Sequence, residues 1–235
     1  MESRFVETGD EGNGARLRVV ELAPRLAEAL ERTGLPPSAL AAKSFGTKVT
    51  DHRSSWVRRG AVAAIEVFAK TYDYPTLRDR LRGAFRTTWL RPGRARREAA
   101  ALRLLQAEGL PGPAPLAVLE WREFGWLRRA VLVTEAWPAP SIAELYGRLD
   151  PAGRRALAAA ARSFAQRLHA FGFVDRNLDP RNLLAAQRDD GSFRIAKIDS
   201  PRFQRLPPGR RLNRLAALDR ARLERGLRDL DRVAP

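Results

Sequence analysis

The feature that most constrains the fold is a change in hydrophobic patterning at Pro138 and Pro140. Before these prolines, runs of alternating apolar and polar residues dominate, with helical stretches among them. After them, apolar residues recur mostly at helical spacing, and one short hairpin pattern surrounds "RDDGSF". We therefore expect an α+β chain with a β-rich N-lobe followed by a short α-rich C-lobe.

The predicted strands of the first lobe are separated by turn residues. "ARLRVVELAPRLAEALERTG" fits a surface helix, or a strand followed by a helix, that stops at Gly34. "TKVTDHRSSWVRRGAVAAIEVFAK" fits two or three strands with a hairpin turn at Gly60. "PAPLAVLEWREFGWLRRAVLVTEAW" predicts two more strands around a turn at Gly125.

Helices are predicted where the apolar spacing lengthens to three and four residues. One helix begins after Pro92 and ends near Gly109. Its apolar stripe consists of Ala95, Ala99, Leu102 and Leu105. Later, "SIAELYGRL" and "DPAGRRALAAAARSFAQRLHAFG" fit helices, the second of them capped by Asp150. A leucine-spaced helix is expected over about residues 211–232.

These patterns predict three regions. Residues 1–14, in which glycines lie among charges, are expected to be a flexible N-terminus. Residues 15–137 are expected to form the β-rich N-lobe, and residues 138–235 the α-rich C-lobe. A cleft between two such lobes is a natural site for a small ligand.

The composition argues against several kinds of site. The chain has no cysteine, which excludes disulfides and thiolate-bound metals. Its two histidines, His52 and His169, are too few to favour a zinc or di-iron centre. No run approaches ~20 apolar residues, so no transmembrane segment is expected. The charged start of the chain does not fit a signal peptide, and the expected location is the cytoplasm.

The chain is strongly basic, with a net charge of +16 from 43 Lys and Arg against 27 Asp and Glu. Such a surplus favours an anionic partner, which could be a nucleotide, a nucleic acid or an anionic lipid surface. Most of the cations are arginine, so the coding bias of a GC-rich genome is an equally good explanation. Aromatic residues do not alternate with the basic runs, which argues against a nucleic-acid-binding module.

The stretch "GFVDRNLDPRNLL", residues 172–184, carries the most specific chemical signal. Asn177 is followed five residues later by Asn182, and "AKIDS" then brings Asp199. A phosphotransferase uses this spacing to hold magnesium and to position a hydroxyl nucleophile, but it needs an Asp where this chain has Asn177. Asn182 and Asp199 are hard oxygen donors suited to magnesium. Alternatively, Asn182 bonds its own loop and Asp199 is a turn residue before Ser200.

Two charged residues in the first lobe fit the same chemistry. Lys70 closes the apolar strand "AIEVFAK", from which it could reach phosphates. Glu98 lies near the start of a predicted helix and could hold the lysine in an ion pair. Each also has an ordinary explanation, as a solvent-facing Lys at a strand end and as a Glu that complements the helix dipole. The order of these residues with Asn182 and Asp199 is more specific than any one of them.

Together these segments resemble the lipopolysaccharide kinase family of bacteria, the heptose and Kdo kinases with a protein-kinase-like fold. The likeness runs from about Lys48 to Asp229. It rests on "VFAKTY", "RARREAAALRLLQAEGLPGPAPLAV", "LVTEAW", "GFVDRNLDPRNLL" and "IAKIDSPRF". The resemblance implies a two-lobed fold, ATP and Mg²⁺ as cofactors, and phosphotransfer to a lipopolysaccharide core sugar. The acceptor would be an anionic glycolipid, which places the chain peripherally at the inner membrane surface.

By this resemblance, Lys70 is the phosphate lysine and Glu98 its ion-pair partner. Asn182 and Asp199 are the magnesium ligands. No GxGxxG precedes the lysine, so the turn in "DHRSSW" is the candidate cover for the phosphates. Its backbone near Ser54 and Ser55 would lie over them.

The same resemblance places a hinge near Glu135 and Ala136, whose backbone groups would meet the adenine. The family's catalytic loop has the form His-x-Asp-Leu-x-x-x-Asn, and this chain departs from it twice. Asp175 stands at the His position and Asn177 at the position of the catalytic Asp. An amide cannot accept the proton of the acceptor hydroxyl, and losing a general base typically costs ~10²–10⁴ in rate.

Asp179 is a candidate for a displaced base, because it lies two residues beyond Asn177. Its other role would be to cap the loop before Pro180. Three hypotheses follow from these residues: a kinase with impaired catalysis, a pseudokinase that acts as a scaffold or regulator, and a nucleic-acid-binding module driven by charge.

Overall fold

The structure is a computed structural model that describes residues 7–11, 15–76 and 92–233. It divides into two units. The first unit contains Met1–Ala100 and Ala114–Ala136, and the second contains Ala101–Pro113 and Trp137–Pro235. The chain therefore crosses the boundary three times: within helix α3 (Arg94–Ala107), just before β6, and just after β7, the last strand of the first unit.

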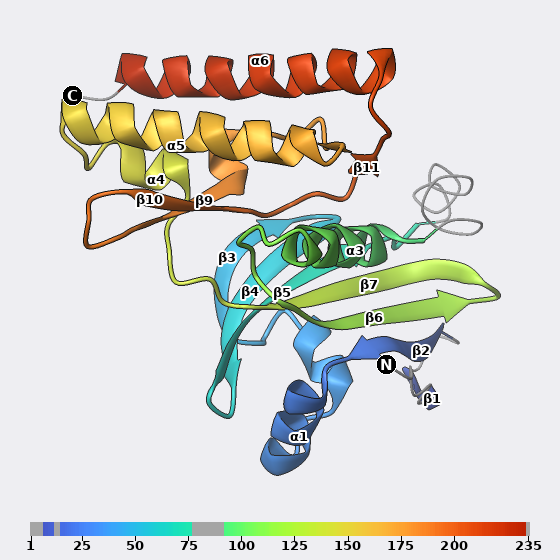
Figure 1. The fold of residues 1–235 in the computed structure, drawn as a ribbon. Helices are drawn as coiled ribbons and strands as arrows, with labels where there is room; N and C mark the ends of the chain where they lie inside the picture. The colour runs from blue at the N-terminus through green and yellow to red at the C-terminus, as the bar shows by residue number, and fades with distance from the viewer. Residues whose placement is uncertain (1–6, 12–14, 77–91, 234–235) are drawn as a thin grey trace. The chain divides into compact units, whose positions relative to one another are not determined.

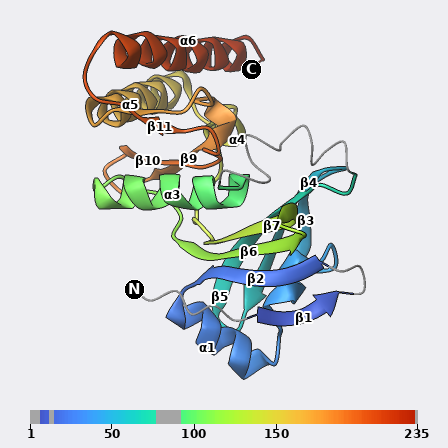
Figure 2. The same cartoon turned by 90° about the vertical axis from the view of Figure 1, so that its right-hand side faces the viewer.

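The first unit is built on a seven-stranded sheet in the order β1-β2-β6-β7-β5-β4-β3, seen in Figures 1 and 2. Its strands are β1 (Glu7–Glu11), β2 (Ala15–Leu22), β3 (Thr47–His52), β4 (Ser55–Val62), β5 (Ile65–Asp73), β6 (Pro115–Glu123) and β7 (Trp126–Glu135). All neighbouring strands are antiparallel. Helix α1 (Pro24–Thr33) and the short helix η1 (Pro37–Ala41) pack on one face of the sheet, where they share a hydrophobic core with its strands.

The N-terminal segment differs from the prediction of a flexible terminus over residues 1–14. Glu7–Glu11 form strand β1, which pairs with β2. The hydrogen bonds of this pairing occupy an edge that the sheet would otherwise expose, which is a tertiary effect that the local composition does not reveal. The rest of the predicted flexible segment, residues 1–6 and 12–14, lies outside the described residues.

The hairpin turn predicted at Gly60 was wrong. Gly60 lies inside β4, opposite Val67, and the turn between β4 and β5 follows at residues 63 and 64. A Cβ at Gly60 would lie 2.8 Å from the ring of Phe45. The glycine is therefore required for close packing of an aromatic ring rather than for a turn. Ala63 takes the left-handed conformation of the true turn, with φ 50°.

The second unit is mainly helical. It contains α4 (Ile142–Tyr146), α5 (Pro151–Ala170) and α6 (Arg210–Val233), and α5 and α6 lie side by side in Figures 1 and 2. The cap predicted for α5 is present, because the Asp150 side chain accepts a hydrogen bond from the backbone of Gly153. No helix within the described ranges has both the length and the apolar character needed to cross a bilayer.

Two small antiparallel pairs position the loops of interest in the second unit. Strand β8 (Phe173–Val174) pairs with β11 (Gln204–Arg205), and β9 (Leu183–Gln187) pairs with β10 (Phe193–Lys197). The short helix η3 (Pro180–Asn182) precedes β9. The segment 175–182 therefore connects β8 to β9, and the segment 198–203 connects β10 to β11. The two pairs bring these segments together.

Gly172 joins α5 to β8, and its substitution tests how closely the second unit depends on this junction. Gly172 has φ 83°, and a Cβ there would lie 2.1 Å from the carbonyl oxygen of Leu206. Gly191 has a similar φ of 78° but nothing within 4 Å of such a Cβ. We expect Gly191→Ala to cost only the left-handed strain of about 1–3 kcal/mol. Gly172→Ala is expected to cost clearly more, because the backbone must also move.

Urea unfolding of the two variants measures this difference as a change in the free energy of unfolding. Equal losses in Gly172→Ala and Gly191→Ala would contradict the close packing of Gly172 against Leu206.

Candidate functional site

Strand β5 places Lys70 beside a buried carboxylate. Val67 and Ala69 are buried on one face of β5. Because side chains alternate along a strand, Phe68, Lys70 and Tyr72 lie on the other face. The Nζ atom of Lys70 lies 3.2 and 3.1 Å from the two carboxylate oxygens of Glu98 on α3. Glu98 is 4% exposed. The ion pair predicted from the sequence is therefore present within the first unit.

Tyr72 completes this group and was not predicted. Its hydroxyl donates a hydrogen bond of 2.6 Å to Glu98, and Lys70 lies 5.3 Å from the centre of its ring. Burial, followed by the negative charge of Glu98, raises the pKa of Tyr72 well above the 10.0 of an ordinary phenol. The phenol is therefore a protonated donor at neutral pH. The sequence contained one signal for Tyr72, because a residue two positions after Lys70 shares its face of a strand.

The other nucleotide-binding candidates of the first unit occupy turns and strand ends. Ser54 lies in the turn between β3 and β4, and its carbonyl accepts a hydrogen bond from the backbone of Asp73. Ser55 is the first residue of β4. The hairpin that contains them immediately precedes the lysine strand, which is where a cover over phosphates was predicted. That role stays a prediction.

The predicted hinge residues use their backbone donors within the first unit. The amide of Glu135 donates to the carbonyl of Ala114, and that of Ala136 donates to the carbonyl of Glu66. The side chain of Glu135 forms an ion pair with Arg25. Contact of these two residues with adenine stays a prediction, and in this arrangement it would have to use their carbonyl groups.

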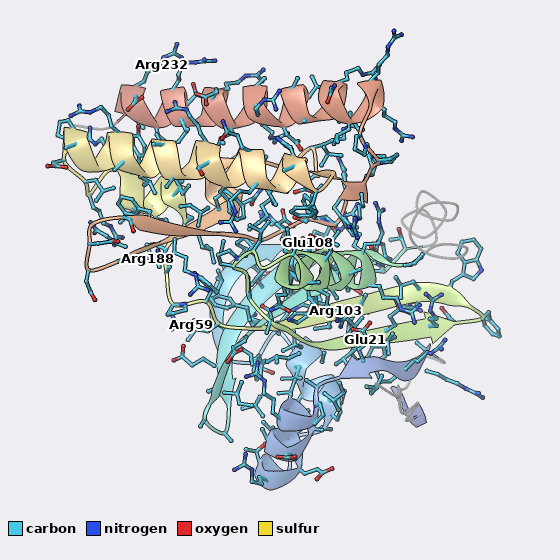
Figure 3. All side chains as sticks on the ribbon, in the orientation of Figure 1. Glu21, Arg59, Arg103, Glu108, Arg188 and Arg232 are labelled. Atoms are coloured by element: carbon cyan, nitrogen blue, oxygen red, sulfur yellow. The ribbon has the colours of Figure 1, made fainter. Side chains whose placement is uncertain are left out.

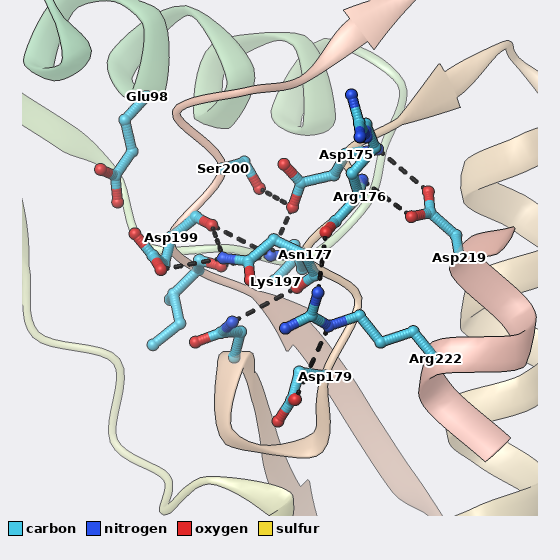
Figure 4. A network of polar contacts seen from close by, with 12 residues as sticks. Glu98, Asp175, Arg176, Asn177, Asp179, Lys197, Asp199, Ser200, Asp219 and Arg222 are labelled. Atoms are coloured by element: carbon cyan, nitrogen blue, oxygen red, sulfur yellow. Dashed lines mark hydrogen bonds and ion pairs between the residues drawn. The ribbon is translucent and has the colours of Figure 1, made fainter. Parts of the chain in front are cut away.

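In the second unit, Asn177 is bonded to the predicted metal ligands on both sides. Its side-chain nitrogen donates to the backbone carbonyl of Asp199 at 2.8 Å and to the Asp199 carboxylate at 2.9 Å. The side-chain nitrogen of Asn182 donates to the Asn177 carbonyl at 3.3 Å. Because both partners of the Asn177 amide are acceptors, its nitrogen is the atom that must face them. Figure 4 shows Asn177 lying next to Asp199.

Asp175 and Lys197 form a buried ion pair beside these residues. The Nζ atom of Lys197 lies 2.9 Å from a carboxylate oxygen of Asp175, and the two residues are 0% and 1% exposed. The Ser200 hydroxyl donates to the same oxygen at 3.0 Å. Burial raises the pKa of Asp175, although the charge of Lys197 acts in the opposite direction. The lysine also donates to the backbone carbonyls of Ile198 and Asp199.

Asp219 on α6 holds the start of the same loop. Its carboxylate accepts hydrogen bonds from the backbone amides of Asp175 and Arg176, at 3.0 and 2.7 Å. It was not predicted, but the sequence carries a signal for it. Asp219 interrupts the buried stripe of α6 between Ala216 and Leu223, where a charge is costly unless it is bonded. Lys197, at the end of an apolar strand, carried the same signal.

Two residues of this region have left-handed backbones without being glycine. Arg176 has φ 60° and Asp199 has φ 58°. Such conformations cost of order 1–3 kcal/mol each and persist only where the surroundings determine them. The backbone of Arg176 is held by the hydrogen bond from its amide to Asp219. The backbone of Asp199 is held by the hydrogen bonds that Lys197 donates to the carbonyls of Ile198 and Asp199.

Asp179 caps the short helix η3, as one of its two predicted roles required. Its carboxylate accepts from the backbone of Arg181 at 3.1 Å and forms a two-pronged pair with the Arg181 side chain. These hydrogen bonds lower the pKa of Asp179. A carboxylate held in this way is a weak proton acceptor, and its role as a displaced base stays a prediction.

The donor set around Asn177 fits a magnesium ion. Asp199 offers a carboxylate, and Asn182 offers its amide oxygen, since its nitrogen is directed to the Asn177 carbonyl. Mg²⁺ usually takes one or two such protein oxygens and completes its shell with water and substrate phosphates. Within the described ranges, no cluster of three or more His, Cys, Asp or Glu side chains could hold a metal.

Comparisons with known proteins give a family match and a structure of similar fold. A profile of the Lipopolysaccharide kinase (Kdo/WaaP) family matches residues 54–233. A solved structure described as "WaaP in complex with acyl carrier protein" is similar, with a TM-score of 0.60, 21% sequence identity, and coverage of 88% of this chain and 80% of that chain. At this identity the likeness shows the fold, and it confirms the predicted fold class. A search of curated proteins finds no match.

The hydrogen bond from Tyr72 to Glu98 can be tested by Tyr72→Phe. We expect this variant to lose about 1.5–3 kcal/mol of unfolding free energy near neutral pH, because a buried carboxylate loses a donor. Since the pKa of Tyr72 is raised in the folded state, its stabilisation is present below pH 10.0 and is lost as the pH rises through the folded-state pKa. The stability of Tyr72→Phe should therefore fall less steeply above about pH 10 than that of the natural chain.

Urea unfolding at several pH values measures both effects as changes in the free energy of unfolding. A profile for Tyr72→Phe that runs parallel to that of the natural chain at all pH values would contradict the assignment.

Proposed function

Because the chain belongs to the lipopolysaccharide kinase (Kdo/WaaP) family, we propose that it binds ATP together with magnesium and is built as a phosphotransferase. Lys70 contacts the nucleotide phosphates, and Asn182 with Asp199 holds the metal. The observation that carries the proposal is the ion pair between Lys70 and the buried Glu98. It holds a half-buried ammonium group in one place, where the charge of phosphates would be neutralised.

The neighbours of this pair support the same role. Glu98 is fixed by Tyr72 as well as by the lysine, so the carboxylate is oriented even when Lys70 turns toward a phosphate. When bound, magnesium would supply charge neutralisation at the phosphates. The chain's own contribution is to hold Asp199 and Asn182 in position for it, through Asn177. Ser54 and Ser55 remain the candidates for covering the phosphates.

The site lacks a carboxylate at the position expected to take the proton of the acceptor hydroxyl. In this proposal the γ-phosphoryl group passes to a hydroxyl of a lipopolysaccharide core sugar, whose proton must be taken up by another group. Asn177 occupies the position of the expected base, but it is an amide whose nitrogen faces Asp199. Phosphoryl transfer depends mostly on positioning and electrostatics, so turnover is expected to be slow rather than zero.

The geometry of Asn177 also favours a second candidate function. A chain that binds nucleotide but turns it over very slowly could act as a pseudokinase, in which the bound nucleotide stabilises a scaffold or regulator. The observation in favour is that the Asn177 amide nitrogen donates to both the carbonyl and the carboxylate of Asp199. The two functions differ in turnover and share the nucleotide site.

The partner of the second unit is proposed to be anionic. Helix α6 exposes a series of arginines, and Figure 3 shows the Arg232 side chain extending from it. They are Arg210, Arg211, Arg214, Arg220, Arg222, Arg225, Arg228 and Arg232. An anionic glycolipid acceptor at the inner membrane surface would fit this charge, as would an acyl carrier protein like the one in the similar structure if that partner is acidic.

Cosedimentation with anionic vesicles at low and high salt tests the membrane partner, because binding that is driven by charge weakens as the salt concentration rises.

Nucleotide binding is tested by thermal unfolding. A ligand that binds only the folded state at a hundredfold excess over Kd contributes about 2.7 kcal/mol. For a chain of this size that raises the melting temperature by very roughly 5–10 °C. We expect ATP with magnesium to produce this shift, and Lys70→Met and Asp199→Ala to abolish most of it.

Lys48→Met is the matched control, because Lys48 is an exposed lysine on β3, another strand of the same sheet. It should keep the full shift. A natural chain whose melting temperature does not respond to ATP with magnesium would refute the nucleotide site.

Turnover separates the two candidate functions. Asn177→Asp restores a carboxylate at the position of the base, and a general base contributes ~10²–10⁴ in rate. We expect the rate of ATP turnover to rise at least about tenfold in this variant. Measurement of phosphate release under saturating ATP and magnesium decides the question. An equal rate in the natural chain and Asn177→Asp would show that the base lies elsewhere, and Asp179→Asn would then be the next variant to measure.

A further inference from the structure

We infer that Asp175, Asn177 and Lys197 form a positioning network that holds Asp199 in its metal-binding conformation before any ligand arrives. In the family's pattern, the first two positions carry His and the catalytic Asp. In this chain Asn177 bonds the residue that the proposed function assigns to the metal, and Asp175 bonds Lys197 and Ser200 beside it. The inference deepens that function and rests on it, since Asp199 matters here as a ligand of the magnesium that accompanies the nucleotide.

Asn177 fixes the side chain of Asp199. One amide nitrogen bonds both the backbone carbonyl and the carboxylate of the same residue, at 2.8 and 2.9 Å. These two bonds restrain the backbone and the side-chain torsions of Asp199 at once. An Asp at position 177 could not do this, because two carboxylates at that distance repel each other unless a proton or a cation lies between them.

Lys197 fixes the backbone on either side of Asp199. Its ammonium group donates to the carbonyls of Ile198 and Asp199, and it is 0% exposed. A buried ammonium requires a counter-charge, which Asp175 supplies at 2.9 Å. Asp175 also accepts from the Ser200 hydroxyl, so it binds the residue that follows Asp199 as well. Figure 4 shows these side chains converging on the segment around Asp199.

The network stabilises a strained backbone conformation at Asp199. Asp199 is in the left-handed region at φ 58°, a strained conformation for a residue other than glycine. The opposite side of the network is anchored independently, because Asp219 on α6 accepts from the backbone amides of Asp175 and Arg176. The segment 175–177 is thus fixed to a helix, and it transmits that fixed position to Asp199.

A preorganised ligand binds its metal more tightly because less conformational freedom is lost on binding. Residues that orient metal ligands in this way typically change metal affinity by 10–100-fold when they are replaced. The network therefore favours retention of the metal–nucleotide complex over proton transfer. Asp175, Asn177 and Lys197 are positioning residues in this account, because they act through Asp199.

Two variants remove the network without leaving a buried charge unpaired. Asn177→Leu removes the amide and keeps a side chain of similar size. The double variant Asp175→Leu with Lys197→Met removes both members of the ion pair together, since loss of one alone would leave the other buried and uncompensated. Tyr146→Phe is the control, because it removes a hydrogen bond to Asp231 elsewhere in the same unit.

The first measurement is the affinity for ADP with and without magnesium, by titration calorimetry. The positioning role predicts that the factor by which magnesium improves ADP affinity falls at least about tenfold in both network variants. The affinity for ADP without magnesium should stay within about twofold, because Lys70 and the first unit are unchanged. Tyr146→Phe should keep the full magnesium effect. A merely structural role would weaken both affinities together.

The second measurement is hydrogen exchange of the ligand-free chain. The network predicts faster exchange of backbone amides in residues 198–206 of both variants, with the protection of α5 unchanged. Variants that keep the natural magnesium effect and the natural exchange of residues 198–206 would overturn the inference. Exchange that becomes faster uniformly over the second unit would overturn it too, because it would indicate general destabilisation.

The two measurements distinguish failure of the inference from failure of the proposed function. If the natural chain binds no ADP under either condition, the proposed nucleotide site is refuted. Hydrogen exchange still decides whether the network holds Asp199. Local loss of protection in both variants would support the network in that case, and unchanged protection would overturn it.

Discussion

The buried ion pair between Lys197 and Asp175 is the interaction on which the arrangement of the second unit's loops depends. Neither charge could be buried alone, and breaking such a pair by removing one partner typically costs about 3–5 kcal/mol. The pair joins the end of β10 to the segment that follows β8, so it ties two loops that are brought together by separate strand pairs. With the lysine's bonds to the carbonyls beside Asp199, it sets the backbone on which the candidate metal ligand lies.

The polar group around Glu98 and the polar group around Asp199 are held together in the same way. In each, a carboxylate is held by donors that carry no competing negative charge: Glu98 by Lys70 and Tyr72, and Asp199 by Asn177. A carboxylate held in this way keeps one orientation without a bound cation, because the donors satisfy part of its hydrogen-bonding capacity. In the proposed function, Glu98 would keep Lys70 in place for phosphates, and Asn177 would keep Asp199 in place for magnesium. The arrangement is less suited to proton abstraction, for which an unencumbered carboxylate near the acceptor hydroxyl would be needed.

Sequence patterns predicted most of the elements correctly and misplaced a turn and a terminus. The apolar stripe of α3, the cap of α5, the hairpin of β9 and β10, and helix α6 are all present. Such features depend on spacing within a few residues, which the sequence displays directly. Gly60 was misread because its lack of a side chain serves packing against Phe45, and β1 because its stability comes from pairing with β2. Both depend on neighbours that are distant along the chain.

The sequence by itself determined the candidate residues for phosphate and metal binding and, through strand and helix spacing, the elements that carry them. It also determined that the base position holds an amide. Only the tertiary structure decided what that amide does, because its partner Asp199 lies 22 residues away, and the anchor Asp219 lies 44 residues from Asp175. Helices, strands and caps depend on residues that are close along the chain, so the sequence displays them directly. The partner of a buried polar group depends instead on which loops the strand pairs bring together.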